Sequence, residues 1–382
     1  KEGGNGMRKG WEYKKLGEIA KCAIGLTYKP ENVTEELSGT IVLRSSNIQN
    51  SILDFNDIVR VNVPVKEDKI VKDGDILMCS RNGSIRLVGK VALIKNLKER
   101  MSYGAFMTII RSQYNPYLFE YFKTPAFRQY LIAGKTTTVN QITVKMLNNL
   151  TIPLPPLSTQ LAIVSELDKI NELIRLKKEQ LKDFDNLAQS LFYEMFGDPV
   201  ENEKGWEVKK LNEIVSDNCS ISYGIVQPGD GVENGVPVVR PVDMTKTFVS
   251  RKGLKNTTKE ISDSYKRTIL KGNEILMCVR GTTGLISMAT PELQGCNVTR
   301  GIAPIECGPT CDKWFVFYQI LNPAIQHHIA EYTRGIALKQ INMKDVRDIP
   351  LCLPPLSLQR LFAQRIEQIE REKSEVQKSI QD

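Results

Sequence analysis

The stretch from Leu157 to Phe196 constrains the fold more than any other part of the chain. It contains neither Gly nor Pro, and apolar residues recur every seven positions from Leu167 to Met195. A sustained seven-residue apolar repeat predicts a long helix that packs against a partner helix along one narrow seam. At ~1.5 Å per residue, about 38 residues make a rod roughly 55 Å long. A single globular domain seldom needs such a rod.

A second copy of this helix is predicted near the C-terminus. Residues 155–160 read Pro-Pro-Leu-Ser-Thr-Gln, and residues 354–359 read Pro-Pro-Leu-Ser-Leu-Gln, 199 positions later. We therefore expect two helices that follow equivalent turns, with Ser158 and Ser357 as N-caps. They should pack as an antiparallel coiled coil through a common seam. The predicted seam residues are Ile163, Leu167, Ile170, Ile174, Leu181, Phe184, Phe362, Ile366, Ile369 and Val376.

Two lysines interrupt this seam. Lys177 takes a seam position in the first helix, and Lys373 falls where Ile174 stands in the first copy. A Lys in a coiled-coil seam lowers stability but can fix the register of the two helices.

The duplication extends beyond the helices. The sequence Gly-Trp-Glu begins at Gly10 and again at Gly205, 195 positions later. Short repeats of 20–50 residues indicate a solenoid, whereas a period near 200 indicates two whole domains. We predict an α/β fold of the mixed α+β kind, with two similar strand-rich heads related by a pseudo-two-fold axis.

The repeats also set the expected domain bounds. Residues 1–6 precede Met7 and resemble an expression remnant. The heads should span residues 7–156 and 198–355, and the long helices residues 157–197 and 356–382. The 199-residue shift predicts that the second helix ends near residue 395, so we expect either a truncated chain or a short member of its class.

Matching landmarks recur inside each head. A predicted buried strand leads to Arg81 in the first and to Arg280 in the second, and a Gly-bearing loop follows each. Later helical segments contain Pro125 and Pro323, so each should divide into two short helices. Gly197 should end the first long helix.

Charge and composition restrict the class of protein. The formal net charge is +8, and residues 1–156 hold 23 of the 52 basic but only 14 of the 44 acidic side chains. Such an excess suits a polyanionic partner or simply favours solubility. No apolar run approaches the ~20 residues of a membrane span, and no signal-peptide pattern opens the chain. Eight cysteines in this context indicate cytosolic thiols.

Basic and polar residues on equivalent loops are the candidate DNA-binding residues. Arg and Asn can make bidentate contacts to base edges, Ser and Thr can contact bases or phosphates, and Lys suits phosphates. A solvated loop explains any one of these residues alone, but recurrence in both heads favours binding. The candidates are Arg44, Arg81, Asn82, Ser84, Arg86, Lys135, Lys145, Arg240, Arg280, Thr282, Thr283, Arg334 and Lys344.

Catalytic motifs are weak by comparison. The segments at 227–231 and 322–325 lack the aromatic residues of a methyltransferase cofactor loop and active-site motif. Asp198, Glu207 and Lys209 have only a loose nuclease spacing. Cys307 and Cys311, followed by the adjacent histidines 327 and 328, have only a loose zinc-ligand spacing. We therefore predict no catalytic site and no metal site.

The combined pattern resembles the specificity subunit of Type I restriction–modification systems. In that family two target-recognition domains each begin with a Trp-x-x-x-x-Leu-like segment, and a Pro-Leu-Pro-Pro-Leu-x-x-Gln-like turn introduces each conserved helix. The matching segments here are residues 11–16, 206–211, 152–160 and 351–359. Cys352 replaces the first Pro of the second turn.

The resemblance implies a DNA reader without catalysis of its own. Each domain would read one half of a bipartite site in double-stranded DNA, and the paired helices would set the spacer. Two methyltransferase subunits carrying S-adenosylmethionine would dock on the helices. Restriction-translocation subunits, which use ATP and Mg, would join them in the prokaryotic cytoplasm.

Two other classes remain open at this point. A coiled-coil adaptor would bind proteins through the same duplicated heads, and a stand-alone nuclease or modification enzyme would act without partners. The arginine-bearing loops argue against the adaptor, and salt-sensitive binding to duplex DNA would separate the two classes. Cleavage by the isolated chain with Mg²⁺ would favour the enzyme.

Overall fold

A computed structural model describes residues 10–133, 140–335 and 338–381. The chain forms two compact units, Lys1–Leu173 (unit 1) and Ile174–Asp382 (unit 2). The long helix α5 gives its N-terminal part to unit 1 and its C-terminal part to unit 2. No helix in the described ranges is long and apolar enough to cross a membrane.

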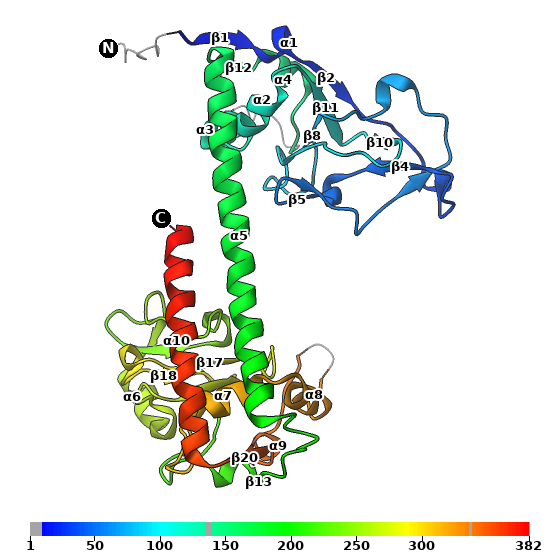
Figure 1. Ribbon diagram of the computed structural model, residues 1–382. Helices are drawn as coiled ribbons and strands as arrows, with labels where there is room; N and C mark the ends of the chain where they lie inside the picture. The colour runs from blue at the N-terminus through cyan, green and yellow to red at the C-terminus, as the bar shows by residue number, and fades with distance from the viewer. Residues whose placement is uncertain (1–9, 134–139, 336–337, 382) are drawn as a thin grey trace. The chain divides into compact units, whose positions relative to one another are not determined.

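Unit 1 combines short strands with a few helices (Figure 1). Its elements are β1 (Glu12–Lys15), α1 (Leu16–Ile19), β2 (Lys21–Ile24), β3 (Val33–Thr34), β4 (Thr40–Leu43), β5 (Ile48–Gln49), β6 (Ile52–Leu53), β7 (Arg60–Val61), β8 (Ile76–Cys79), β9 (Val91–Leu93), β10 (Met101–Tyr103), β11 (Met107–Arg111), α2 (Asn115–Phe122), α3 (Pro125–Ala133), α4 (Val144–Asn149) and β12 (Thr151–Leu154). Helix α5 (Leu157–Phe196) follows.

Unit 2 repeats the main landmarks of this order, with fewer strands among the described residues and an added helix, α6. After α5 come β13 (Glu207–Lys210), β14 (Val236–Val239), β15 (Lys255–Thr257), α6 (Lys259–Ser264), β16 (Ile275–Cys278), β17 (Ile286–Met288), β18 (Asn297–Val298), β19 (Ile302–Ile305), α7 (Lys313–Leu321), α8 (Pro323–Glu331), α9 (Met343–Arg347), β20 (Pro350–Leu353) and α10 (Leu356–Gln381).

Strand pairing confirms that the two units share one fold. The opening strand pairs antiparallel with the closing strand in each unit, β1 with β12 and β13 with β20. Strands β4 and β10 pair in parallel, as do β14 and β18. Strand β8 lies between β9 and β11, and β16 lies between β17 and β19, all antiparallel. The predicted mixed α+β class is therefore correct.

The central strand of each unit is covered on both faces. Both β8 and β16 read Ile-Leu-Met-Cys, and all four residues are buried in each copy. Because side chains alternate along a strand, one face of β8 contributes Ile76 and Met78 to one core, and the other contributes Leu77 and Cys79 to a second core. Strand β16 divides two cores of unit 2 in the same way.

The prolines divide the later helical segments as predicted. Helix α2 ends at Phe122 and α3 begins at Pro125, while α7 ends at Leu321 and α8 begins at Pro323. Proline fixes its own φ and lacks the N–H that a helix interior requires, so it suits the first helical position.

Helices α5 and α10 pack antiparallel in unit 2, as Figure 1 shows. The rings of Phe192 and Phe362 are 5.7 Å apart. Lys373 Nζ lies 2.7 Å from Asp185 Oδ1, and a later residue of α10, Ser379, accepts a hydrogen bond from the Lys177 ammonium at 3.2 Å. Residues further along α10 therefore contact residues nearer the start of α5, as the antiparallel prediction requires.

Burial along the predicted seam is uneven. Phe362, Ile366 and Ile369 are buried, and four further seam residues are partly buried in unit 2: Ile174, Leu181, Phe184 and Val376. In unit 1, Leu167 is partly buried, and Ile163 is partly buried against the core of that unit.

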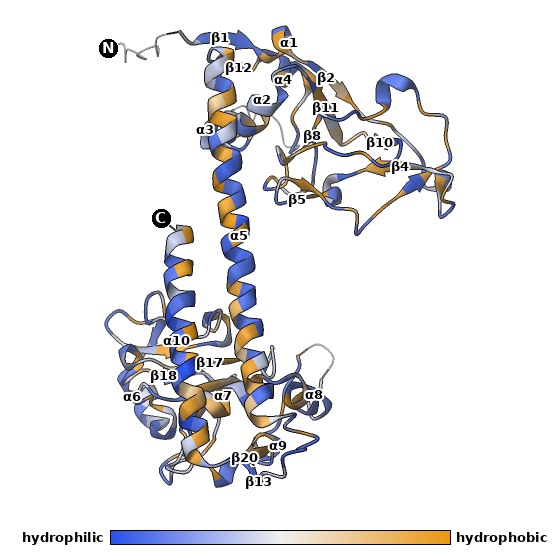
Figure 2. Cartoon of the chain, viewed as in Figure 1, coloured by the Kyte–Doolittle hydropathy of each residue, from blue (hydrophilic) through white to orange (hydrophobic). Residues whose placement is uncertain are grey.

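Ile170 corrects the seam prediction because it is 51% exposed. Ser379 of α10 already lies opposite Lys177, so the described part of α10 offers no partner for the turn around Ile170. Figure 2 shows hydrophobic and hydrophilic turns interleaved along α5.

The predicted serine N-caps are wrong. Helices α5 and α10 begin at Leu157 and Leu356, which places both serines inside the first turn. The prolines before them supply the cap carbonyls, which accept from the Gln160 N–H at 3.0 Å and the Gln359 N–H at 3.2 Å. Each Gln side chain also folds back to a proline carbonyl at 2.7 Å, Pro155 in one turn and Pro354 in the other. These buried amides make the two turns equivalent.

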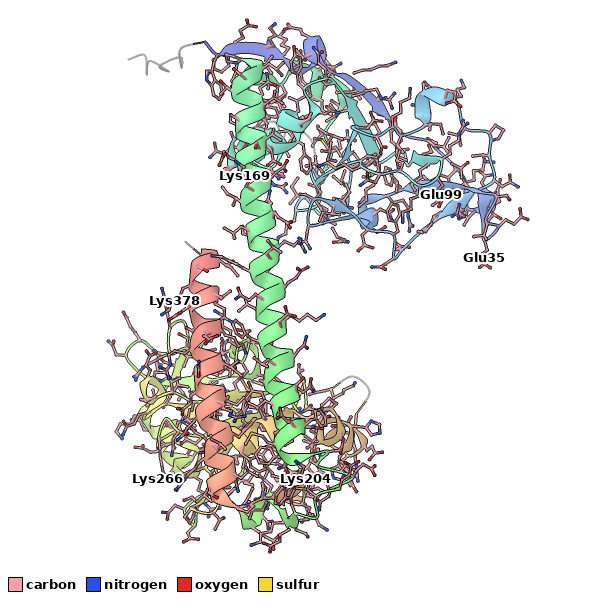
Figure 3. All side chains as sticks on the ribbon, in the orientation of Figure 1. Glu35, Glu99, Lys169, Lys204, Lys266 and Lys378 are labelled. Atoms are coloured by element: carbon pink, nitrogen blue, oxygen red, sulfur yellow. The ribbon has the colours of Figure 1, made fainter. Side chains whose placement is uncertain are left out.

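The C-terminus of α5 is capped by residues that follow it. Gly197 ends the helix with a φ of +77°, a conformation that favours glycine. Lys204, labelled in Figure 3, donates to the carbonyls of Glu194 and Met195 at 2.8 and 2.9 Å. The indole N–H of Trp206 donates to the Phe196 carbonyl at 2.9 Å. The Trp that opens the second repeat therefore closes the helix before it.

Lys373 is a buried seam residue with two acidic partners. Its Nζ lies 2.7 Å from both Asp185 Oδ1 and Glu370 Oε1. Burial would lower the pKa of Lys373, but the hydrogen bonds to the two carboxylates outweigh it and raise that pKa above its ordinary value. The Tyr318 hydroxyl donates to the same Glu370 oxygen at 3.2 Å. This network holds one turn of α10 opposite one turn of α5.

Replacing Phe362 by Ala tests how much the helix contact stabilises unit 2. Phe362 is fully buried against Phe192 and Phe196, so Phe362→Ala should lower the free energy of unfolding by about 3–5 kcal/mol. The control Leu361→Ala removes a neighbour that is 44% exposed and should cost less than about 1 kcal/mol. Denaturant unfolding measures both. If Phe362→Ala lowered the free energy of unfolding as little as the control does, the contact between α5 and α10 would contribute little to stability.

Candidate nucleic-acid interface

The loop after the central strand has the same backbone contacts in both units. Arg81 forms a β-bridge with Gln141, and Arg280 forms one with Gln340. A buried thiol two residues earlier donates to each arginine carbonyl, Cys79 Sγ at 3.6 Å and Cys278 Sγ at 3.2 Å. The structure therefore places these two predicted arginines at equivalent points of the fold.

In unit 1, Asn82 ties this loop to the turn that follows β4. Its side chain donates to Ser45 Oγ at 3.2 Å and accepts from the Ser84 N–H at 3.0 Å. The Ser84 side chain is exposed, and so is that of Arg86, whose carbonyl accepts from the Arg128 guanidinium at 3.3 Å. Asn82 therefore holds the loop in place while its neighbours face solvent.

In unit 2, Gln340 brings two predicted arginines together. It bridges Arg280 and also Arg334, with which it exchanges two backbone hydrogen bonds of 2.8 Å. Thr283 Oγ1 accepts from Thr333 Oγ1 at 3.1 Å, which secures the loop from the other side. Arg334 and Thr282 are exposed.

The remaining predicted lysines lie on separate elements. Lys145 on α4 and Lys344 on α9 are both exposed. Lys135 lies outside the described residues.

Arg44 and Arg240 differ from the other predicted arginines because a carboxylate holds each one. Arg44 Nη2 lies 2.7 Å from Asp57 Oδ1. The Arg240 guanidinium donates two bonds to Asp243, at 3.0 and 2.8 Å, and these bonds raise the pKa of Arg240. Their side chains therefore fix local structure, and fewer of their donors are available to a ligand.

Arg81 lies over an aromatic ring instead. Its guanidinium carbon is 5.3 Å from the centre of the Phe106 ring, and Phe106 is 58% exposed. Phe106 also lines a cavity of about 750 Å³, together with Tyr28, Arg44 and Ser45 among others. Stacking aromatics and unpaired guanidinium groups are typical of nucleic-acid surfaces.

Unit 2 has a similar pair that the sequence did not predict. The Arg300 guanidinium carbon lies 5.9 Å from the centre of the Tyr223 ring. The Arg300 backbone N–H donates to Ile225 two residues beyond that tyrosine, at 2.7 Å. Arg300 is separated from Tyr223 by 77 positions, so no local pattern could have revealed the pair. The available signal was an arginine two residues after the end of β18.

Two glycines hold the segments that carry these pairs close together. A Cβ on Gly25 would collide with the Tyr103 and Gly104 carbonyl oxygens, and one on Gly224 would collide with the Val298 carbonyl oxygen. The following residues make parallel bridges, Leu26 with Gly104 and Ile225 with Thr299. The two glycines are therefore equivalent. At each one the backbone lies so close to the neighbouring segment that no side chain would fit between them.

The weak catalytic candidates have local structural roles in the structure. Asp198 Oδ1 accepts from the backbone N–H of Val200 at 2.8 Å and of Glu201 at 3.2 Å. Glu207 pairs with Lys209 at 3.4 Å. All these contacts join residues two or three positions apart, in the turn after α5 or in β13.

The thiols of Cys307 and Cys311 contact each other, which raises the pKa of Cys307, whereas the histidine candidates make separate local contacts. Cys311 Sγ donates to the Ile214 carbonyl at 3.0 Å, while His327 is mostly exposed and lies 3.5 Å from Glu331. All eight cysteines are free thiols. Within the described ranges, no group of three or more His, Cys, Asp or Glu residues could hold a metal ion.

Comparison with known proteins adds a family and a fold. The family profile described as "Type I restriction modification DNA specificity domain" matches residues 8–183 and 203–382. The chain is 26% identical over 404 aligned residues to the putative Type I restriction enzyme MjaX specificity subunit of Methanocaldococcus jannaschii, covering 97% of this chain and 90% of that protein. It is 24% identical to the Type I restriction enzyme EcoBI specificity subunit of Escherichia coli, covering 70% of this chain and 61% of that protein.

Solved structures agree on the fold. A chain from a structure described as "complex assembly and conformational transition of the type I R-M system" aligns with a TM-score of 0.58 at 21% identity, covering 98% of this chain and 93% of that one. The Type I restriction–modification system S subunit from M. genitalium aligns with a TM-score of 0.51 at 16% identity, covering 99% and 95%.

Stability measurements should separate the two kinds of arginine. Arg240→Ala removes a half-buried partner that donates two hydrogen bonds to Asp243 and should lower the free energy of unfolding by about 1 kcal/mol. Arg280→Ala removes no side-chain hydrogen bond in the described part of the chain and should change it by less than about 0.5 kcal/mol. Thermal or denaturant unfolding provides the measurement. A larger loss for Arg280→Ala would contradict the distinction.

Proposed function

The chain belongs to the Type I restriction–modification DNA specificity family, and from this premise we propose that each of its two units reads one half of a bipartite site in double-stranded DNA. It is the DNA-recognition subunit of such a system. The observation that carries the two-part proposal is the duplicated loop with Arg81 and Arg280 at equivalent backbone positions.

The chemistry of the loops supports DNA as the ligand. A guanidinium with free donors can contact guanine O6 and N7 together, and this contact distinguishes guanine from the other bases in the major groove. Exposed lysines such as Lys145 and Lys344 suit phosphate contacts, which position a protein on DNA without reading its sequence.

The partners belong to the proposal as well. Two methyltransferase subunits with S-adenosylmethionine would use the helices α5 and α10 as a docking surface, and restriction-translocation subunits would supply ATP- and Mg-dependent steps in a prokaryotic cytoplasm. The chain would contribute recognition and no catalysis. The relatives' description as specificity subunits of restriction enzymes supports this division of labour.

Binding and cleavage assays test the proposal against its rivals. Duplex affinity should fall steeply as salt rises from about 50 to 200 mM, because phosphate contacts release counterions. An adaptor would show no such binding. Cleavage or methyl transfer by the purified chain alone, with Mg²⁺ or S-adenosylmethionine, would instead identify an enzyme.

Exchanging the first head should change one half of the methylated motif. We expect a chain whose residues 7–156 come from another family member to direct methylation to a site with a new half and the original second half. Methylome sequencing of a host that carries the complete system measures both halves together. The unaltered chain in the same host is the control. A change in both halves would contradict independent reading.

Lengthening α5 should lengthen the spacer between the half-sites. Seven added residues between Leu173 and Ile174 make nearly two helical turns and add roughly 10 Å, which corresponds to about three base pairs. Methylome sequencing should therefore recover both original half-sites with a longer spacer. An equally long insertion in the exposed loop at Asp230–Gly231 is the control and should leave the spacer unchanged.

A further inference from the structure

Each unit presents one arginine stacked on one aromatic ring, and we propose that these two pairs read guanine. The pairs are Arg81 with Phe106 in unit 1 and Arg300 with Tyr223 in unit 2. Phe106 and Tyr223 act as positioning residues, and the arginines contact the base. The inference rests on the proposed function, since it names the residues through which each unit distinguishes its half-site.

The two pairs occupy the same region of the fold. One member of each pair, Phe106 or Arg300, lies on the turn that follows β10 or β18, next to the bridge that this turn makes with the residue after Gly25 or Gly224. The Phe106 carbonyl accepts from the N–H of Ser80 at 2.9 Å, and the Gly301 carbonyl accepts from that of Val279 at 2.8 Å. These contacts make Phe106 and Gly301 equivalent positions.

The pairs nevertheless use different positions. In unit 2 the position equivalent to Phe106 is Gly301, which has no ring that Arg280 could contact. The arginine of the unit 2 pair is instead the residue before that glycine, Arg300. The unit 1 residue equivalent to Arg300 is Ala105, and the one equivalent to Tyr223 is Ile24. The fold itself therefore requires neither pair. Each unit makes an arginine–ring contact in the same region of the fold but with residues at different positions, which indicates that the contact itself has a function.

The local electrostatics leave both guanidinium groups available. Among the described residues, no hydrogen bond or ion pair engages the side chain of Arg81 or Arg300, and both are exposed. Arg44 and Arg240, in contrast, are held by carboxylates. A ring face attracts a cation without using its N–H donors. Stacking therefore restricts the guanidinium to a plane and keeps its donors free for guanine O6 and N7.

Ring-removing and ring-keeping variants test the proposal. Phe106→Leu keeps an apolar side chain but loses the ring face, whereas Phe106→Tyr keeps the ring. Phe55→Leu is a matched control, because Phe55 is also exposed in unit 1 but lines a different cavity. Tyr223→Leu and Tyr223→Phe form the corresponding pair in unit 2. The full chain with its methyltransferase subunits is used to select sites from a randomised duplex library, which is then sequenced.

We expect Phe106→Leu to bind its selected site about threefold to tenfold more weakly and to lose its preference for guanine at one position of one half-site. Phe106→Tyr and Phe55→Leu should select the original motif. Tyr223→Leu should relax one guanine in the other half-site only. The slope of affinity against salt should stay the same in all variants, because no phosphate contact is removed.

Two results would overturn the proposal. An unchanged motif and affinity for Phe106→Leu would show that the ring does not position a base contact. Uniform weakening on all sequences with a shallower salt slope would show that Arg81 contacts phosphate instead. If the unaltered chain selects no motif, the proposed function itself is wrong, so the two failures can be told apart.

Discussion

The packing of α5 and α10 into the core of unit 2 is the interaction on which much of the structure depends. Phe192 and Phe196 of α5 and Phe362 of α10 share one buried cluster with Phe315 of α7. The same cluster includes residues of β16 and β19. The end of α5 is therefore part of a globular core rather than a linker, and β16, the strand that leads to Arg280, is anchored to it.

The ionic contact beside this cluster has a different role from the aromatic one. Lys373 and Glu370 are 6% and 8% exposed, and withdrawing such groups from water costs several kcal/mol per ion before their attraction offsets it. An apolar seam could slide by one heptad with little loss, whereas a lysine placed elsewhere would be buried without Asp185 and Glu370. The network contributes register more than stability, as a polar residue in a coiled-coil seam often does.

The sequence predicted those features that depend on repetition and periodicity. The duplicated fold, the antiparallel helices, the helix breaks at Pro125 and Pro323 and the equivalence of Arg81 and Arg280 all rest on spacing along the chain. The helix starts were assigned to the wrong residues because serine is the commoner cap. There, a proline carbonyl and a buried Gln amide satisfy the first turn instead.

What the sequence could not reveal depends on contacts between distant segments. Arg44 and Arg240 looked like Arg81 as candidates, yet Asp57 and Asp243 hold them. The aromatic partners were invisible for the same reason: an exposed ring near an arginine is a property of folded segments. Ile170 fits the heptad pattern, but such a pattern predicts only which face of a helix is apolar. It does not predict how far the partner helix extends along that face.

The backbone contact at Gly25 and Gly224 restricts how such a duplicated reader can evolve. The loops around it differ between the two units, yet both keep glycine, because a single added methyl group would collide with carbonyl oxygens of the neighbouring segment. In unit 1 that segment leads directly to Phe106. A substitution at Gly25 would therefore displace both the buried end of β10 and the turn that carries Phe106, the ring proposed to position a base contact. A change at one glycine would thus alter the packing of a strand and the recognition surface together, and selection would act on both at once.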